Sequence, residues 1–523
     1  MAAETNAIAL TVPALLARNR RAAGSQHVVV SDERSITHAE FDDQSRALAA
    51  RLVAAGVGKA SSVGLLAPNG VEWAVAAAAV MRIGAVLVPL STLLKAPELE
   101  AQLAVASVSH LLVAREFRGR RYLDEVEQVA PGGLSAGPAG RRSEVLPLLR
   151  QVWAADELPL ATVSDDVVAA LEAAVRPADD LVVLFTSGSR GAPKGVIHTH
   201  GGALRAVAAG LESRCVGAAE RLYIPMPFFW TGGFSGGLMT ALVAGATLLT
   251  EATPEPESTL ALLERERATL FRGWPDQAVR LAAHPSFAAA DLSSLRAGSL
   301  PAVLPAQLRP SPGSRANLFG MTETFGPYSG DRADIDLPRE KHGSCGRPFE
   351  GVEVRICDPD SGEPCAAGIT GEICVRGPNV MRGICGRMRE EVFRADGFYR
   401  TGDLGSLDSD GYLWYAGRLD DMFKVKGATV FPTEVEAALR GIDGVKQAFV
   451  TDVRDADGVA QVGAFLVSNA PLEQVAAAAR TRLSAFKVPQ LWLLADASEL
   501  PMTATAKVDK AALQELLRSK GRK

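Results

Sequence analysis

The sequence predicts an α/β protein with a large, multi-subdomain amino-terminal domain of mostly parallel sheets over residues 1–418 and a small α+β domain over residues 419–523. Apolar runs alternate with helical stretches in the first 115 residues, and these runs are too continuous for strands with one face in water. Beyond Arg418, short helix and strand patterns follow one another over about a hundred residues, which is enough for a separate domain. The full length of 523 residues allows several such packed units.

The first predicted element is a helix that begins near Thr37. Thr37 and Glu40 have the spacing of a capping box, in which each side chain bonds the other residue's backbone. Phe41 and Leu48 then recur on one helical face, and Gly56 offers a stop.

Three apolar runs follow, at residues 63–67, 85–90 and 109–114, and an alanine-rich helical stretch at 71–82 separates the first two. Strand, helix and strand in this order predict parallel strands that are covered on both faces.

In the carboxy-terminal part, residues 434–444 predict a short helix that ends at glycine. Two strands at 445–453 and 459–468 and a last helix at 508–521 complete the expected small domain.

Composition excludes several classes of protein. With 47% hydrophobic and 22% charged residues, the chain has an ordinary globular composition, so we exclude disordered and fibrous proteins. The net charge of −5 gives no support to a nucleic-acid partner. Six cysteines without a C-x-x-C pair indicate a reducing compartment, and we expect the cytoplasm.

One long uncharged segment raises the question of whether the chain crosses a membrane. Residues 222–250 carry no charge and are long enough to span a bilayer. Pro225, Pro227 and the glycine pairs at 232–233 and 236–237 would break a spanning helix. We therefore expect a buried loop-and-helix segment and no transmembrane segment. We expect no export signal at the amino terminus, because Glu4 replaces the expected positive charge and Pro13 interrupts a short apolar stretch.

A glycine-rich loop follows the apolar run at 181–185. The letters TSGSRGAPKG at 186–195 supply hydroxyls, glycines and a lysine, which is a composition typical of phosphate-binding loops. It is not a Walker motif, because Pro193 and Gly195 stand where glycine and Ser or Thr are required. From this loop alone, a surface loop without function is an equal alternative.

Three further segments accompany the loop: LFGMTET from Leu318, YRTGDLG with GRLDDMFKVKG between Tyr399 and Gly427, and LPMTATAKVDK from Leu500. Together the four segments resemble the adenylate-forming superfamily, which contains acyl-CoA synthetases, luciferases and the adenylation domains of peptide synthetases. They occur in the family's order and are spread over essentially the whole chain. The resemblance implies a large domain joined by a hinge to a small one that rotates between two catalytic orientations.

The resemblance implies roles for residues of the larger domain. Phe319 stands at the usual tyrosine that packs on adenine, Thr322 matches the contact to the α-phosphate, and Glu323 matches the Mg²⁺ carboxylate. Arg190 departs from the usual threonine of the glycine loop. The implied phosphate contacts of that loop are Thr186, Ser187, Gly188, Ser189 and Lys194.

Further roles follow for the later motifs. Asp403 resembles the carboxylate that binds the ribose, and Arg418 the arginine that contacts the nucleotide. Asp420 falls at the family's hinge, and Gly427 matches the loop that lines the pantetheine tunnel for CoA. Lys507 matches the catalytic lysine, so Lys507, Thr322 and Glu323 are the expected catalytic group. Ala506 replaces the usual glycine before that lysine.

The motif MPFFWTGGF indicates the acyl pocket. Many relatives have histidine where this chain has Trp230, and we expect Phe229, Trp230 and Phe234 to line an apolar pocket. Residues 222–250 lack the aspartate that holds the amino group in peptide-synthetase domains, which argues against an α-amino acid substrate. His198 and His200 have no nucleophile constellation beside them, so a packing role is favoured over a catalytic or metal-binding role.

The sequence therefore predicts an enzyme, an AMP-forming acyl-CoA synthetase that uses ATP, Mg²⁺ and CoA on an apolar fatty, alicyclic or aryl acid. An acyl-AMP ligase that loads a carrier protein is the first alternative, since it would share every nucleotide motif. A non-catalytic nucleotide-binding homologue is an alternative of another class. Glu323, Asp403 and Lys507, all present, argue against it.

Overall fold

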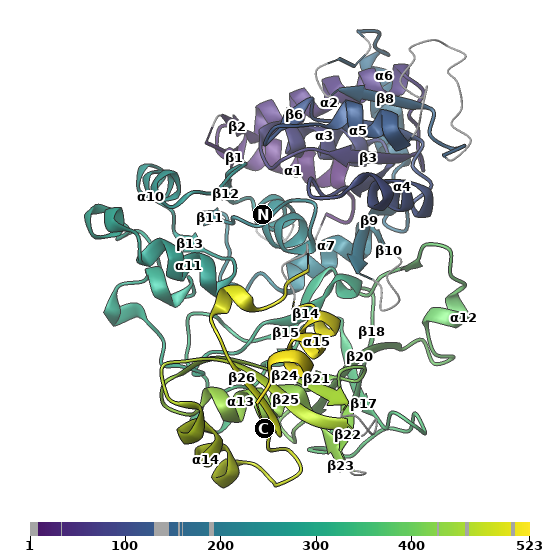
Figure 1. Ribbon diagram of the computed structural model, residues 1–523. Coiled ribbons are helices and arrows are strands. Elements are labelled where there is room, and N and C mark those ends of the chain that lie inside the picture. The colour runs from purple at the N-terminus through teal and green to yellow at the C-terminus, as the bar shows by residue number, and fades with distance from the viewer. Residues whose placement is uncertain are drawn as a thin grey trace. The chain divides into compact units, whose positions relative to one another are not determined.

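The computed structural model describes residues 9–32, 34–129, 146–154, 157–158, 160–187, 193–425, 428–454, 460–503 and 508–522. It divides into two compact units. Figure 1 colours the chain by residue number from the amino to the carboxy terminus. The first unit contains residues 1–353 and 376–399, and the second contains residues 354–375 and 400–523. Residues 400–418 thus pack with the carboxy-terminal unit. The domain boundary expected between residues 418 and 419 and the hinge expected at Asp420 both stay predictions.

A seven-stranded sheet of order β19-β10-β9-β4-β3-β5-β8 forms the centre of one part of the first unit. Its pairs β8–β5, β5–β3, β3–β4 and β4–β9 are parallel, which confirms the mostly parallel α/β prediction. The strands are β3 (Ser62–Leu66), β4 (Val86–Pro89), β5 (His110–Val113), β8 (Gln151–Ala154), β9 (Asp180–Ser187), β10 (Pro193–Thr199) and β19 (Gly383–Ile384).

The helices of this part confirm the first sequence predictions. Thr37 and Glu40 form the expected capping box at the start of α2 (His38–Ala54). The alanine-rich helix α3 (Val71–Arg82) is buried almost all round, which explains its lack of a polar face. The other elements are α1 (Val12–Ala23), α4 (Ala96–Val105), β6 (Glu116–Phe117), β7 (Arg120–Arg121), α5 (Tyr122–Val129), α6 (Asp165–Ala174) and α7 (His200–Ala209).

A five-stranded sheet of order β13-β11-β12-β1-β2 lies in the same unit. The uncharged segment 222–250 contributes two of its parallel strands and the helices between them, and most of its side chains are buried, as predicted. The elements here are β1 (His27–Val30), β2 (Ser35–Thr37), β11 (Arg221–Tyr223), α8 (Thr231–Gly233), the π-helix η1 (Phe234–Met239), α9 (Thr240–Ala244), β12 (Thr247–Leu249), α10 (Pro256–Arg265), β13 (Leu270–Phe271) and α11 (Pro275–Ala282). Among helices of the described residues, none combines the length and apolar character needed to cross a bilayer.

Shorter elements complete the first unit, including a three-stranded antiparallel sheet of order β14-β15-β16. These elements are η2 (Pro285–Ala289), η3 (Pro301–Val303), η4 (Ala306–Leu308), β14 (Phe319–Met321), η5 (Thr322–Thr324), β15 (Gly326–Gly330), η6 (Arg339–Lys341), β16 (Arg347–Pro348) and α12 (Arg389–Val392).

The second unit contains the predicted small α+β fold. A three-stranded sheet, β24 (Val445–Arg454), β25 (Ala460–Ser468) and β26 (Leu491–Leu494), packs with α13 (Pro432–Arg440) and α15 (Lys510–Lys520). These elements confirm the helices and strands expected from the sequence beyond residue 432. The remaining elements are β17 (Glu353–Cys357), β18 (Gly371–Arg376), β20 (Tyr399–Leu407), β21 (Leu413–Arg418), β22 (Phe423–Val425), β23 (Ala428–Val430), α14 (Leu472–Arg482) and η7 (Ala497–Glu499).

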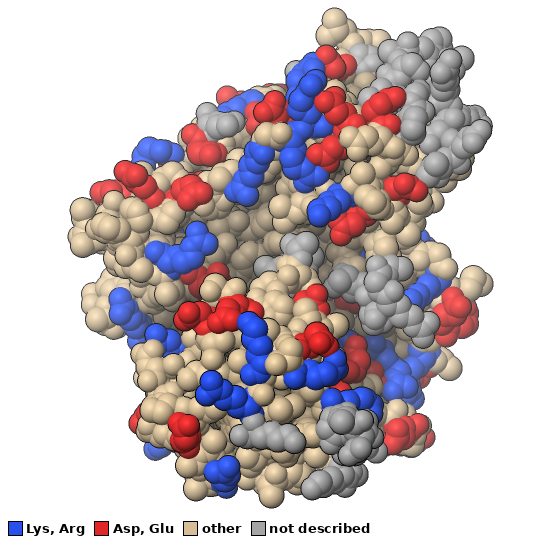
Figure 2. All heavy atoms as spheres, viewed as in Figure 1, with Lys and Arg blue, Asp and Glu red and all other residues tan. Residues whose placement is uncertain are grey.

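On the face that Figure 2 shows, basic and acidic side chains of the coloured residues are interspersed. Such mixing gives nucleic acid no broad positive surface to bind there.

Candidate active site

Three segments that are distant in sequence bring Lys194, Glu323 and Tyr399 together in the first unit. The Lys194 ammonium forms an ion pair with Glu323 Oε1 and donates a hydrogen bond to the Tyr399 hydroxyl at 3.1 Å. Tyr399 in turn donates to Glu323 Oε1 at 3.2 Å. Glu323 is 5% exposed, so the two donors compensate a nearly buried carboxylate. The cluster places a cation and a carboxylate at one point.

Local structure explains how Glu323 reaches this point. A Cβ atom at Gly320 would collide with the carbonyl oxygen of Gly326, so only glycine allows β14 and β15 to approach so closely. Phe325 then takes a left-handed conformation with φ of 57°, which ends η5. A bulky residue in this conformation is strained, and such strain is concentrated at functional sites.

Thr322, beside Glu323, is held by two neighbours. Its Oγ1 lies 3.0 Å from Oγ1 of Thr231, the residue after Trp230. Its carbonyl oxygen lies 2.7 Å from Nε2 of His198, which therefore carries the hydrogen. Burial lowers the pKa of His198 to about 4, so this side chain is neutral near pH 7. His198 thus has the packing and positioning role that the sequence favoured, and buried His200 accepts the Val12 amide at 3.2 Å.

The glycine loop is only partly described. Thr186 on β9 pairs with Lys194 on β10, so the hairpin carries the lysine to the cluster. For Ser187 only the backbone is described, and Gly188 and Ser189 lie outside the described residues. Phe319 is partly buried on β14, with its ring 5.6 Å from that of Tyr328.

The second unit brings Asp403 and Arg418 together as cross-strand partners on β20 and β21. Arg418 Nη1 lies 3.1 Å from Asp403 Oδ1, and Arg418 Nη2 lies 3.1 Å from Asp420 Oδ1. Burial opposes the charge of Arg418, but the two carboxylates hold its pKa above the ordinary value. Gly402 has φ of 73° and leaves space for this guanidinium, because a Cβ there would lie 2.9 Å from Arg418 Nη2. Gly427 and Lys507 lie outside the described residues.

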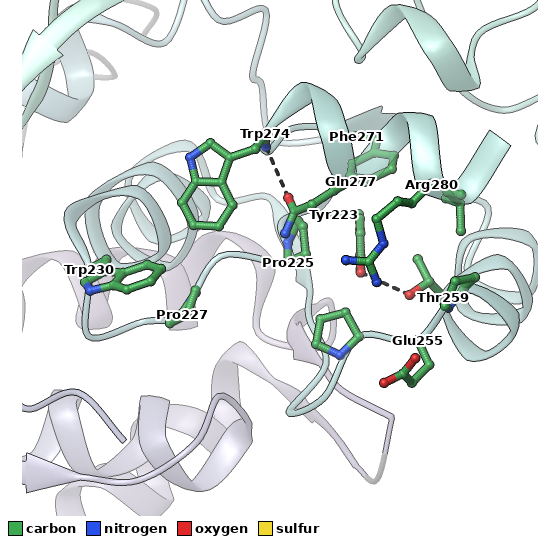
Figure 3. Close-up of a pocket in the computed structure, with 13 residues that line it drawn as sticks. Tyr223, Pro225, Pro227, Trp230, Glu255, Thr259, Phe271, Trp274, Gln277 and Arg280 are labelled. Carbon is green, nitrogen blue, oxygen red and sulfur yellow. Dashed lines mark hydrogen bonds between the residues drawn. The ribbon is translucent and has the colours of Figure 1, made fainter. Parts of the chain in front are cut away.

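Of the three residues expected in the acyl pocket, Trp230 lines a cavity of about 220 Å³ (Figure 3). Its ring stands 5.6 Å from that of Trp274, which is 39% exposed and immediately precedes helix α11. Phe229 is 6% exposed, and Phe234 is fully buried between Trp73 and Phe325. For Phe234 the structure therefore shows a core contact, while its role at a pocket stays a prediction.

Sequence reasoning missed three residues of these sites: Tyr399, Thr231 and Trp274. Tyr399 opens the YRTGD motif and Thr231 directly follows Trp230, so their positions within recognised motifs were the available signal. Trp274 lies 44 residues after Trp230 along the chain and had no such signal, because only the parallel sheet brings the two together.

The chain matches the AMP-binding enzyme family over residues 16–385. The chain belongs to this family. A feruloyl-CoA synthase from an Amycolatopsis species is 34% identical over 512 residues, covering 95% of this chain and 97% of the relative. A methyl-dioxo-octahydroindenyl-propanoyl:CoA ligase from Mycobacterium tuberculosis is 34% identical, covering 97% of this chain and 99% of the relative.

Solved structures show the same fold. The anthranilate CoA ligase in complex with anthranoyl-AMP has a TM-score of 0.77 at 24% identity, with 99% of both chains covered. The o-succinylbenzoate CoA synthetase from Bacillus subtilis with ATP and a magnesium ion has a TM-score of 0.75 at 24% identity, covering 96% of this chain and 99% of that chain. The CoA-ligase relatives match this chain over nearly its whole length. This member of the family is therefore an AMP-forming acid–thiol ligase.

Proposed function

We propose that this enzyme activates an apolar carboxylic acid with ATP and transfers the acyl group to CoA. The observation that carries the proposal is the meeting of Lys194, Glu323 and Tyr399, which come from three of the adenylate-forming motifs. The printed names of the relatives, a feruloyl-CoA synthase, an alicyclic propanoyl:CoA ligase and a medium-chain acyl-CoA ligase, support an acid of the aryl, alicyclic or fatty class.

The reaction has two steps at one acyl group. First, a carboxylate oxygen attacks the α-phosphorus of ATP, a new P–O bond forms, and the bond to pyrophosphate breaks. Then the sulfur of CoA attacks the acyl carbon, the C–O bond to AMP breaks, and the thiol proton is released. The first step brings two anions together, so its barrier is mainly electrostatic and positional.

The residues of this chain have separate tasks in that scheme. Lys194 binds phosphate oxygens, and Thr322, fixed by Thr231 and His198, donates to the α-phosphate. Thr186, Ser187, Gly188 and Ser189 would complete the phosphate contacts, and Phe319 would pack on adenine. Asp403 accepts from the ribose hydroxyls, and Arg418 holds Asp403 in place. Lys507 binds the attacking carboxylate during adenylation, and Gly427 lines the thiol tunnel after rotation at Asp420.

Glu323 fits the Mg²⁺ that this chemistry requires. Magnesium takes oxygen ligands, usually one or two carboxylates together with substrate phosphates. Glu323 supplies such a carboxylate and is fixed by Tyr399. No group of three or more His, Cys, Asp or Glu side chains suited to a metal occurs in the described part of the chain, so phosphate oxygens and water would supply the other ligands. Bound magnesium would neutralise charge on the phosphates.

The experiment has two stages. Pyrophosphate exchange across a panel of fatty, alicyclic and aryl acids identifies the acids that form an adenylate, and exchange with none of them would indicate a non-catalytic homologue. Mass spectrometry of the thiol product then compares CoA with a phosphopantetheinyl carrier protein. A product on the carrier protein alone would replace our proposal by the carrier-loading alternative. The cytoplasm remains our proposal for its compartment.

A further inference from the structure

The cavity that Trp230 lines also contains two polar side chains of helix α11, Gln277 and Arg280. These two residues are three positions apart on the helix, so their side chains share one face. In Figure 3, Trp230 lies at one end of the cavity, Arg280 and Thr259 lie at the other, and Gln277 lies between them. The cavity therefore has an aromatic end and a polar end.

The aromatic end lies beside the residue that we propose for the α-phosphate. Trp230 directly precedes Thr231, whose Oγ1 lies 3.0 Å from Oγ1 of Thr322. An acid whose carboxyl group reacts near Thr322 would place its apolar body along Trp230 and Trp274 and its far end toward Arg280. The volume of about 220 Å³ has room for a substituted ring, since a protein cavity of about 150 Å³ holds benzene.

Arg280 offers hydrogen-bond donors at the polar end. Its side chain is exposed, and it forms no ion pair with any Asp or Glu of the described residues. A guanidinium group has five N–H donors and no acceptor. Glu255 also lines the cavity, is exposed and has no ion pair within the same part of the chain. The charged side chains that line the cavity, one arginine and one glutamate, therefore sum to zero.

Gln277 presents donors as well. Its Oε1 accepts a hydrogen bond from the Trp274 amide at 3.1 Å, drawn as a dashed line in Figure 3. Gly273 leaves room for this arrangement, because a Cβ atom there would lie 2.7 Å from Gln277 Oε1. The carbonyl end of the side chain is thus occupied, and its Nε2 has no acceptor in the described ranges.

The hydroxyl groups at the polar end are already committed. Tyr223 and Thr259 donate to Oε2 of buried Glu251, at 2.7 Å and 2.6 Å. Tyr223 is 0% exposed and Thr259 is 4% exposed, so neither hydroxyl hydrogen is available to a ligand. The donors that remain belong to Arg280 and Gln277, and they select an acceptor oxygen. Because the charges of the lining sum to zero, a neutral acceptor suits this end better than a second carboxylate.

We propose that Arg280 and Gln277 bind a neutral acceptor oxygen at the far end of the acyl substrate. This inference rests on the proposed function and names its substrate class: a carboxylic acid with an apolar body and a distal carbonyl group. Hydrogen bonds from a charged donor such as a guanidinium are stronger than those between neutral groups. Arg280 is therefore the main specificity residue, and Gln277 is the second donor.

The test uses pairs of acids in which a C=CH2 group replaces a C=O group of the same shape. Adenylation of 4-acetylbenzoate is compared with that of 4-isopropenylbenzoate, and 3-(4-oxocyclohexyl)propanoate with 3-(4-methylenecyclohexyl)propanoate. Terephthalate supplies the anionic counterpart of 4-acetylbenzoate. In at least one pair we expect the wild type to prefer the carbonyl acid by about tenfold in kcat/KM, and to use 4-acetylbenzoate better than terephthalate.

Two variants test the donors. Arg280→Met should reduce the preference for the carbonyl acid to about twofold while it retains turnover of the C=CH2 acid. Gln277→Glu keeps the acceptor for the Trp274 amide but removes the donors, so it should also reduce the preference. Arg265→Met is the matched control. Arg265 ends helix α10, is exposed and does not line the cavity, so its loss should leave the preference unchanged.

The contrary outcomes separate this inference from the proposed function. Equal use of both acids in every pair that the wild type adenylates overturns the inference and leaves the proposed function standing. An unchanged preference in Arg280→Met or in Gln277→Glu overturns it as well. A preference for terephthalate over 4-acetylbenzoate overturns the neutral nature of the distal group. Adenylation of no acid at all overturns both proposals.

Discussion

Lys194 and Glu323 form an ion pair across 129 residues of sequence, and the Tyr399 hydroxyl bridges them. The pair compensates one positive and one negative charge at the point where we propose that ATP binds. When phosphate engages Lys194, the Glu323 oxygens lose their strongest donor and become available to a cation. The ion pair is therefore a resting state of the proposed site.

Glu323→Gln should test this role. The substitution keeps the shape of the side chain but removes the charge, so we expect adenylate formation to fall by on the order of a hundred- to a thousandfold. The magnesium concentration needed for half-maximal rate should rise. Tyr399→Phe is the matched control, since it removes one donor to Glu323 and should cost far less. Pyrophosphate exchange at several magnesium concentrations measures both, and equal losses in the two variants would argue against a metal-binding carboxylate.

Trp230→Ala should change the preferred acyl group. Removal of the indole enlarges the cavity that Trp230 and Trp274 line, without touching the nucleotide motifs. Larger acids should gain in kcat/KM relative to smaller ones, while the KM for ATP stays within about twofold of the wild type. A selectivity profile identical to that of the wild type across the acid panel would remove Trp230 from the pocket. A changed KM for CoA with unchanged acid selectivity would assign the cavity to the thiol.

Phe234→Ala should lower the stability of the fold, in contrast with the change of acyl preference expected for Trp230→Ala. This ring is fully buried between Trp73 and Phe325, so its loss should destabilise the fold by about 3 to 5 kcal/mol. Trp230 lies at the cavity, so Trp230→Ala should lower the free energy of unfolding by less than Phe234→Ala does. Thermal unfolding of the two variants provides the comparison.

The buried His198 should make stability depend on pH. Its pKa of about 4 lies below the value of about 6.5 in an unfolded chain, so the unfolded state binds more protons between these pH values. Above pH 6.5, neutral His198 makes its full contribution to the free energy of unfolding. As the pH falls toward 4, this contribution of about 3 kcal/mol is lost. His198→Gln, whose amide retains a donor toward Thr322, should flatten the decline of the melting temperature between pH 7.5 and 5. An unchanged slope would contradict the neutral, buried state of His198.

Much of this architecture was predictable because it depends on local patterns. The capping box of Thr37 and Glu40, the apolar strand runs and the last helix are all encoded within a few residues of one another. Motif resemblance also predicted Glu323 and Lys194 as neighbours of the nucleotide, and the structure places them in one ion pair.

Other features were not predictable because they arise from tertiary packing. Phe234 has the same local sequence context as Trp230, but helix η1 turns it into the core while Trp230 faces the cavity. Arg272 follows an ordinary apolar run, and only the tertiary structure shows that its guanidinium donates to the carbonyl oxygen of Arg214. No periodic pattern in the sequence predicts this hydrogen bond between residues that are 58 positions apart.

Asp420→Pro should separate the two half-reactions. Asp420 lies just after β21, where its carboxylate pairs with Arg418. Proline fixes φ and should hinder rotation at a hinge, so one half-reaction should suffer at least about tenfold more than the other. Asp420→Asn is the control, because it removes the charge but leaves the backbone free. Equal losses of adenylation and thioester formation in a folded Asp420→Pro enzyme would leave no reason to place the hinge there.

Lys507→Ala should slow adenylation selectively. The Lys507 ammonium is expected to meet negative charge on the attacking carboxylate and on the α-phosphate, and to be absent when the thiol attacks the finished adenylate. Loss of one such donor typically costs about 3 to 4 kcal/mol, or roughly a hundred- to a thousandfold in rate, and a full charge is at stake here. Thioester formation from synthetic acyl adenylate and CoA should be largely retained.

Both half-reactions are measured on the same purified Lys507→Ala protein, with Lys510→Ala as the matched control. Lys510 begins α15 three residues later and lies 3.6 Å from Asp421, so its loss should leave both steps within about twofold of the wild type. Melting temperatures near that of the wild type would show that both variants are folded. Because the two steps use the same acyl group and the same nucleotide, a defect confined to adenylation can only come from charge needed before the adenylate exists. Near-normal adenylation, or an equal collapse of both steps in a folded protein, would remove Lys507 from the catalytic role.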